Sequence, residues 1–103
     1  MASSIKIRTK LDGETALIRL LINHPMETGL RKDTEGNLVP IHFIELLTVT
    51  HKERVVLSAQ WGPAVSRNPY LSFRFKGAAK GDKLRVAWSD NKGETGADEF
   101  VLE

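Results

Sequence analysis

Histidine and cysteine are the residues that would most readily hold a metal ion or act as a nucleophile, and this chain has few of them. There are three histidines, His24, His42 and His51, and no cysteine. No two of these histidines show a metal-ligand spacing, and no thiolate can assist them. The absence of cysteine also removes disulfides and thiol catalysis. The sequence therefore predicts no metal site. We expect His42 to be packed or exposed at a strand edge and His51 to lie in a turn.

Two glycine-containing segments resemble functional loops only superficially. Residues 77–83, GAAKGDK, have the wrong glycine spacing for a phosphate loop, and no Ser or Thr follows the lysine. Residues 90–94, DNKGE, lack the alternating ligands of a calcium loop and are explained by a tight turn. A Ser-His-Asp arrangement would be supported by a strained nucleophile turn, whereas the glycines fall in ordinary turns. These patterns predict no catalytic residue and no cofactor.

The most distinctive segment is residues 24–32, HPMETGLRK. Pro25 lacks a backbone donor and Gly29 tolerates a positive φ angle, so the segment is typical of neither strand nor helix. With the polar turn at 33–37, it forms an unusually long connection that continues to Pro40. Such a connection either crosses between sheets or carries a binding surface.

A second irregular segment, residues 61–69, contains two prolines and one glycine, which exclude a regular strand or helix across it. If the two irregular segments share one end of the domain, Arg31, Lys32 and Arg67 could bind an anion. Such cations more often form a solvated rim, so both interpretations stay open.

The composition is that of an ordinary globular domain. The 103 residues are 41% hydrophobic and 27% charged, with 15 Lys and Arg against 13 Asp and Glu. This length predicts a single domain over residues 1–103. The net charge of +2 is small and well mixed along the sequence, so we expect no basic face and no nucleic-acid partner. No apolar run could span a membrane, and the first residues lack the apolar core of a signal peptide, which predicts a cytoplasmic chain or one exported with a partner.

Alternating apolar and polar residues predict a protein made of β-strands. The predicted strands are residues 5–11, 14–22, 41–50, 54–60, 70–76, 83–89 and 94–102. Turn residues separate them at roughly regular spacing, and no segment has a convincing helical period. The pattern predicts an all-β antiparallel sandwich of immunoglobulin or fibronectin type III character. The expected core includes Val55, Leu57 and Ala59, and its centre is expected to hold Trp61, Trp88, Phe73 and Phe75.

Two predicted strands carry large apolar residues on both faces. Leu17 and Leu21 lie on the outer face of the second predicted strand, and Ile44 and Leu46 on that of the third. Antiparallel sandwiches usually have a polar outer face. Either the predicted register is wrong, or these four residues form a second apolar face for a partner.

Four segments of the sequence resemble the SoxZ family of bacterial sulfur-compound oxidation. They are HPMETGLRKD at 24–33, PIHFI at 40–44, AQWGPAVSRNPY at 59–70 and DNKGET at 90–95. Together they extend across nearly the whole chain, and the first and third are the most specific. The resemblance implies an immunoglobulin-like sandwich, in agreement with the predicted strands, and a protein that is not itself an enzyme.

The resemblance also implies a partner, SoxY, which carries the sulfur substrate on a cysteine near its flexible C-terminal arm. The SoxZ subunit binds SoxY, and the SoxYZ heterodimer then visits the other Sox enzymes in turn during thiosulfate oxidation. Family members are thought to reach the periplasm by co-export with a signal-bearing SoxY, which suits a chain without a predicted signal peptide. We infer that the absence of cysteine also suits this role, because no competing thiol lies near the loaded arm.

On this basis we expect partner contacts on the apolar strand faces and in the two irregular segments. The expected contact residues are Leu17, Leu21, His24, Pro25, Met26, Glu27, Thr28, Gly29, Arg31, Ile44, Leu46, Trp61 and Arg67. Produced alone, the chain could self-associate through the same apolar face. The alternative function is a free-standing immunoglobulin-like module that binds a small oxyanion or a carbohydrate, as a monomer and without SoxY.

Overall fold

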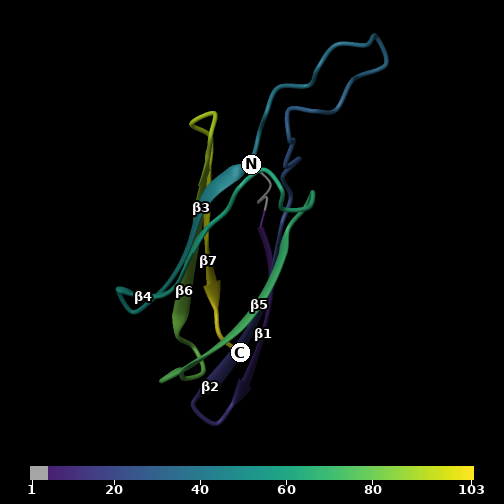
Figure 1. The fold of residues 1–103 in the computed structure, drawn as a ribbon. Helices are drawn as coiled ribbons and strands as arrows, with labels where there is room; N and C mark the ends of the chain where they lie inside the picture. Colours follow the sequence, from purple (N-terminus) through teal and green to yellow (C-terminus); the bar gives the residue numbers. More distant parts are fainter. Residues whose placement is uncertain (1–4) are drawn as a thin grey trace.

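A computed structural model describes residues 5–103 and shows two packed antiparallel sheets (Figure 1). The strands are β1 (Ile5–Asp12), β2 (Thr15–Ile22), β3 (Ile44–His51), β4 (Arg54–Gln60), β5 (Tyr70–Lys76), β6 (Lys83–Asp90) and β7 (Thr95–Val101). One sheet has three strands in the order β1-β2-β5, and the other has four in the order β4-β3-β6-β7. No helix occurs within the described residues. The predicted all-β, immunoglobulin-like sandwich is confirmed.

Alternation of side chains along the strands places one face of each sheet in the core. In β2, Ile18 and Leu20 are at most 1% exposed, whereas Arg19 between them points outward. Successive side chains of a strand point to opposite faces of the sheet. The register of the strand therefore determines which of its side chains lie in the core and which face solvent. The four-stranded sheet contributes the facing layer, with Leu47, Val49, Leu84, Val86 and Trp88.

Two register shifts in β3 alter the predicted faces. One lies between Ile44 and Leu46 in the pairing with β6, and the other between Val49 and Thr50 in the pairing with β4. A bulge adds one unpaired residue and so reverses the facing of the residues beyond it. As a result Ile44 is fully buried in the core, and Val55 on β4 is 55% exposed. The predicted outward Ile44 and inward Val55 are both wrong.

Trp88 lies against a glycine of the next strand. Gly96 on β7 pairs with Trp88 on β6, and a Cβ added to Gly96 would lie 2.4 Å from the indole Nε1. The indole therefore occupies the space that a side chain at this position would need. Trp88 and Phe75 are buried in the core, whereas Trp61 and Phe73 are only partly buried at its margin. The predicted aromatic centre is confirmed for the first pair alone.

The connection between β2 and β3, residues 23–43, projects beyond the end of the sandwich (Figure 1). We call it the long loop. It lengthens a molecule whose extents are 53 × 25 × 21 Å. Backbone hydrogen bonds tie its base to two neighbouring segments, from Asn68 to His24 and from Asn91 to Phe43. Among the described residues, no helix is long and apolar enough to cross a membrane.

Candidate functional site

The long loop is an ordered extension with two limbs rather than a simple crossover. Its limbs pair at two isolated β-bridges, between Glu27 and His42 and between Lys32 and Leu38. At its outer turn, the carboxylate of Asp33 accepts two backbone N–H groups at 2.9 and 3.0 Å. These bonds satisfy backbone groups that would otherwise depend on water. The loop therefore has a defined shape, although most of its residues are exposed.

Three side chains that are far apart in the sequence meet at the base of the long loop. His24 follows β2, His42 precedes β3, and Asp90 ends β6. The Nε2 atoms of His24 and His42 lie 3.0 and 2.6 Å from the same Asp90 oxygen, Oδ2. His24 and Asp90 are buried, and His42 is nearly so. We call these three residues the base clamp, because they join both limbs of the loop to the end of β6.

The proton positions in the base clamp follow from the neighbours of His24. The backbone N–H of Met26 donates to His24 Nδ1 at 3.2 Å, so this nitrogen is an acceptor. A neutral imidazole with an accepting Nδ1 carries its proton on Nε2, which then donates to Asp90. The second carboxylate oxygen, Oδ1, accepts the backbone N–H groups of Lys92 and Glu94 at 3.0 and 2.9 Å. Both oxygens of Asp90 are thus bonded to donors.

Asp90 remains ionised despite its burial. Burial by itself raises the pKa of this carboxyl group, but hydrogen bonds from His24, His42 and the two backbone amides outweigh that effect. Together they lower the pKa of Asp90 from 3.8 to about 2. Each donor favours the charged form of the carboxylate. The base clamp is therefore organised around a buried negative charge.

The base clamp has the ligand types of a metal site, but its hydrogen bonds do not suit one. The ligand atoms of His24, His42 and Asp90 lie within 4.8 Å of one another. A histidine that binds a metal through Nε2 donates its Nδ1 proton to a carbonyl, carboxylate or water. Here Nδ1 of His24 faces the N–H donor of Met26 instead. We interpret the cluster as a structural clamp. The spacing of the histidines along the sequence gives no sign of this cluster, but the fold brings the rings of His24 and His42 together, with centroids 4.4 Å apart.

Met26 and Gly29 have structural roles in the long loop. Met26 is 5% exposed, and its Sδ accepts the backbone N–H of Ile44 at 3.4 Å. Its φ angle of +49° is one that side-chain-bearing residues seldom adopt. Gly29 has a φ angle of +85°, and an added Cβ would lie 3.3 Å from the Cβ of Ile41. A partner surface on this loop would therefore involve its exposed residues rather than these two.

The exposed part of the long loop combines an ion pair with apolar side chains. Arg31 Nη2 donates to Glu27 Oε1 at 2.7 Å, and Arg31 Nε donates to the same carboxylate. The hydrogen bond from Arg31 lowers the pKa of Glu27. Leu30 and Leu38 are 81% and 60% exposed, and Thr28 also faces solvent. The projecting part of the loop therefore exposes two large apolar side chains as well as an ion pair, which are groups that a partner could contact.

The two irregular segments share one end of the sandwich, as the anion interpretation requires. A hollow of about 310 Å³ is lined by Asn23, Pro25, Glu27, Arg31, Arg67 and Asn68. Lys32 is not part of it. Because Glu27 sits in the hollow and pairs with Arg31, the charged groups there sum to +1. This weakly charged hollow suits a polar chain segment better than a tightly held anion.

The four apolar residues predicted to face outward do not form one surface. Leu17 and Leu21 are half-buried on the outer side of the sheet β1-β2-β5. Leu46 is 37% exposed on the other sheet, and Ile44 is in the core. The bulge in β3 accounts for Ile44. A single apolar face built from all four residues is therefore wrong. Trp61 follows β4 and is half-buried against the core.

Charge is less evenly distributed in space than along the sequence. We call the outer side of the sheet β1-β2-β5 the basic face. Its charged residues are the acid Asp12 and the cations Lys6, Arg8, Lys10, Arg19, Arg74 and Lys76. Each strand contributes every second residue to this side, so three cations from β1, one from β2 and two from β5 gather there. The expectation that the chain has no clustered basic face is wrong.

A second histidine and carboxylate pair ties the other end of β3. His51 is the last residue of β3 and is 3% exposed, and its Nε2 lies 2.8 Å from Asp82 Oδ2. The hydrogen bond from His51, aided by the backbone N–H of Ala79, lowers the pKa of Asp82. His51 also contacts the Phe75 ring, with centroids 5.0 Å apart. The prediction that His51 is a turn residue is wrong, because it ends a strand and anchors the turn before β6.

The fold and the site together define an immunoglobulin-like sandwich with a projecting loop. The base clamp holds this loop in place, so its titratable residues have a structural role. The family described as "Sulphur oxidation protein SoxZ" matches residues 5–101, and the chain belongs to this SoxZ family. Membership gives the chain a role in sulfur oxidation and implies a complex with other Sox proteins. Comparison with curated protein sequences gave no match.

Several solved structures share this fold. A superoxide reductase from Nanoarchaeum equitans has a TM-score of 0.68 and 16% identity, covering 97% of this chain and 92% of that one. A variant superoxide reductase (neelaredoxin) from Archaeoglobus fulgidus has a TM-score of 0.68 and 17% identity, covering 98% and 89%. Identities this low show similarity of fold alone.

Proposed function

We propose that this chain is the non-catalytic subunit of a SoxYZ carrier. It binds SoxY, whose C-terminal cysteine holds sulfur intermediates, and helps to present them to the Sox enzymes during thiosulfate oxidation. The observation that carries this proposal is the family match over residues 5–101. The base clamp supports it, because Asp90 is bonded to donors at both oxygens and so serves to hold the loop.

The shape of the long loop supports a presenting role. Its base is fixed by the base clamp, whereas its outer part exposes Leu30, Leu38 and the ion pair of Glu27 with Arg31. A preorganised contact surface loses less conformational freedom when a partner binds. We place contacts with the loaded arm or with the Sox enzymes on this outer part.

The direct test is complex formation with SoxY. A mixture of the two chains should sediment as a one-to-one heterodimer, and a lasting interface should bury more than about 1,200 Å² in total. Leu21→Asp and Leu46→Asp alter different sheets, so each variant tests one of them. Loss of the complex in one variant alone would show which sheet SoxY covers. Failure of the unaltered chain to bind SoxY would refute the proposal.

Turnover in a reconstituted thiosulfate-oxidising system tests the long loop. Leu30→Ser combined with Leu38→Ser removes two exposed apolar groups and leaves the buried Met26 in place. We expect slower thiosulfate-dependent turnover with SoxY binding retained. Val55→Ser is a matched control, since Val55 is also an exposed apolar residue but lies on β4. Full turnover in the loop variant would give the loop a purely structural role.

We also propose that the chain acts in the periplasm, after co-export with a signal-bearing SoxY. Cell fractionation can compare intact SoxY with SoxY lacking its signal. The chain should reach the periplasm only in the first case. Its arrival there beside signal-less SoxY would contradict co-export.

A free-standing binding module is the second candidate, and the hollow beside Arg31 and Arg67 is the observation that favours it. It predicts that the isolated chain binds thiosulfate, sulfate or a carbohydrate in a calorimeter, without SoxY. Arg67→Ala should then remove the binding. Absence of heat with all of these ligands would exclude this candidate.

A further inference from the structure

Positive charge is concentrated on the basic face, although the chain as a whole is nearly neutral. Within residues 5–103 it holds six of the 15 Lys and Arg residues and one of the 13 Asp and Glu residues. It therefore carries +5, while the rest of the chain carries −3, and the net charge of +2 conceals the difference. None of the ion pairs among the described residues involves these six cations. Their charge is available to an external partner.

The sheet register places like charges next to one another on this face. Arg8 on β1 lies directly opposite Arg19 on β2, and Lys10 shares the next row with Arg74 on β5. Directly opposite Cβ atoms are about 5 Å apart, and like charges in such positions destabilise a sheet. The arrangement gives no benefit to folding, which points to an interaction outside the chain.

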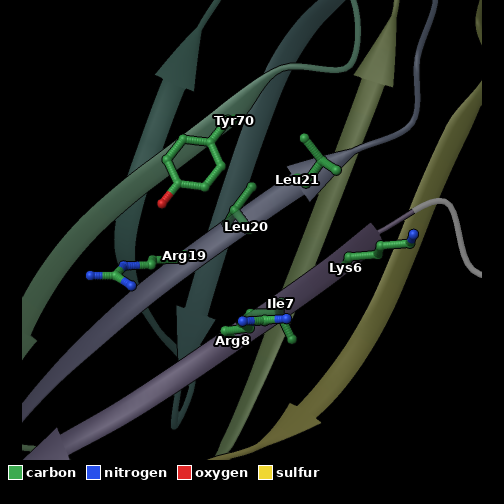
Figure 2. Close-up of a pocket in the computed structure, with 7 residues that line it drawn as sticks. All are labelled: Lys6, Ile7, Arg8, Arg19, Leu20, Leu21 and Tyr70. Carbon is green, nitrogen blue, oxygen red and sulfur yellow. The ribbon is translucent and has the colours of Figure 1, made fainter.

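The basic face is broad and shallow. Its charged rows run from Lys6 to Asp12, a distance of about 20 Å along the strands. The row of Lys6 also contains the half-buried Leu21 and Tyr70, which is 61% exposed. Figure 2 shows Tyr70, Arg19 and Arg8 on the three neighbouring strands β5, β2 and β1. These residues line a depression of about 410 Å³. A small ion would contact a fraction of these charges, whereas a protein surface can contact them together.

We propose that the basic face is a docking surface for an acidic patch on a partner protein that binds and leaves. Charge complementarity identifies the occupant, because a surface of +5 attracts acidic groups and speeds encounter with them. Permanent interfaces are more apolar and poor in lysine, unlike this face. Tyr70 and Leu21 provide a small apolar centre of the kind protein interfaces use.

This inference rests on the proposed function, since the acidic partner is then a Sox enzyme that the SoxYZ carrier visits. It requires that SoxY, as the permanent partner, binds elsewhere and leaves the basic face open. Leu46 is an exposed apolar residue on the other sheet, and Leu46→Asp tests whether SoxY binds there.

The test compares two charge reversals in the assembled SoxYZ complex. Arg8→Glu with Arg19→Glu alters the basic face. Lys80→Glu with Lys92→Glu changes the net charge equally, in two exposed turns that are not part of that face. At low ionic strength, the carrier concentration that half-saturates thiosulfate-dependent turnover should rise at least about tenfold in the first variant only, with kcat unchanged. Added salt should reduce this difference, because it screens exposed charges.

A second readout uses poly-L-glutamate and a single-stranded DNA oligonucleotide of equal charge as probes for the isolated chain. Poly-L-glutamate should bind at least about tenfold more weakly to the basic-face variant than to the control variant. Tighter binding of the DNA than of poly-L-glutamate would overturn the assignment to a protein partner. Equal effects of the two reversals, or loss of SoxY binding in the basic-face variant, would overturn the docking surface itself. If the unaltered chain fails to bind SoxY, the proposed function is refuted. The poly-L-glutamate comparison still tests, independently of SoxY, whether the basic face binds an acidic chain.

Discussion

Replacing Asp90 with asparagine tests the base clamp most directly. Asparagine keeps an oxygen that can accept the backbone N–H groups of Lys92 and Glu94. Its amide NH₂ group, however, would face the Nε2–H of His24, which now donates to Asp90 Oδ2. Two donors would then face each other in a buried site, and an unsatisfied buried group costs about 1–3 kcal/mol.

The pKa of Asp90 gives a second route to the same magnitude. The difference between 3.8 and about 2 corresponds to about 2 kcal/mol of stability, at about 1.4 kcal/mol per pH unit. Because the folded-state pKa is the lower one, this contribution is complete above the unfolded-state pKa of 3.8 and disappears as the pH falls through about 2. At neutral pH, the unaltered protein should therefore exceed Asp90→Asn by about 2 kcal/mol in free energy of unfolding.

Urea unfolding of both proteins over a series of pH values measures this difference. The difference in free energy of unfolding between the two proteins should be largest near neutral pH and should decrease between about pH 4 and pH 2. Amide hydrogen exchange should also quicken at Glu27 and His42, whose backbones pair at the base of the long loop. A gap that keeps its size down to pH 2 would refute the reasoning, because ionisation of Asp90 would then not be its source.

Two other substitutions test the packing that supports the site. Gly96→Ala should lower the free energy of unfolding by about 1–3 kcal/mol, because the new Cβ would lie 2.4 Å from the Trp88 indole. The same clash should shift the tryptophan fluorescence spectrum. An unshifted spectrum together with full stability would contradict this contact. Met26→Ala should lower the free energy of unfolding by about 2–5 kcal/mol in urea titrations, since Met26 is 5% exposed. Thr28→Ala, in the exposed part of the same loop, removes only an acceptor for the Leu30 N–H and should lower it by about 1 kcal/mol or less. Equal effects at these two positions would mean that Met26 is not part of the core.

The strands could be predicted from the sequence wherever alternation is unbroken. Ile18 and Leu20 are buried as their period of two requires, and so is Phe75 on β5. The prediction failed in β3 and β4, because a bulge changes the facing of every residue beyond it without leaving a clear signal in the sequence. Ile44 is the clearest example, since one unpaired residue moves it from the surface to the core.

The candidate site was less accessible to sequence reasoning, because its parts meet only through long-range contacts. His24 and Asp90 are 66 positions apart, so no spacing rule relates them. The available signal was chemical: a buried carboxylate needs several donors, and both histidines flank a loop whose ends must converge. The basic face escaped notice for a related reason. Arg8, Arg19 and Arg74 belong to strands that become neighbours only in the folded sheet.

The basic face and the long loop are linked through a short stretch of chain that hydrogen bonds hold to its neighbour. β2 supplies Arg19 and Leu21 to the basic face and leads two residues after its end into His24. Next to it, Asn68 exchanges two hydrogen bonds with His24, at 2.9 and 3.0 Å, and stands two residues before Tyr70 on β5. A partner attracted to the basic face therefore meets a loop whose base is fixed relative to the sheet. Because the base clamp draws its charge from Asp90 on the other sheet, loosening the loop leaves the cations in place. Attraction of a partner and presentation to it thus depend on different residues and can be altered separately.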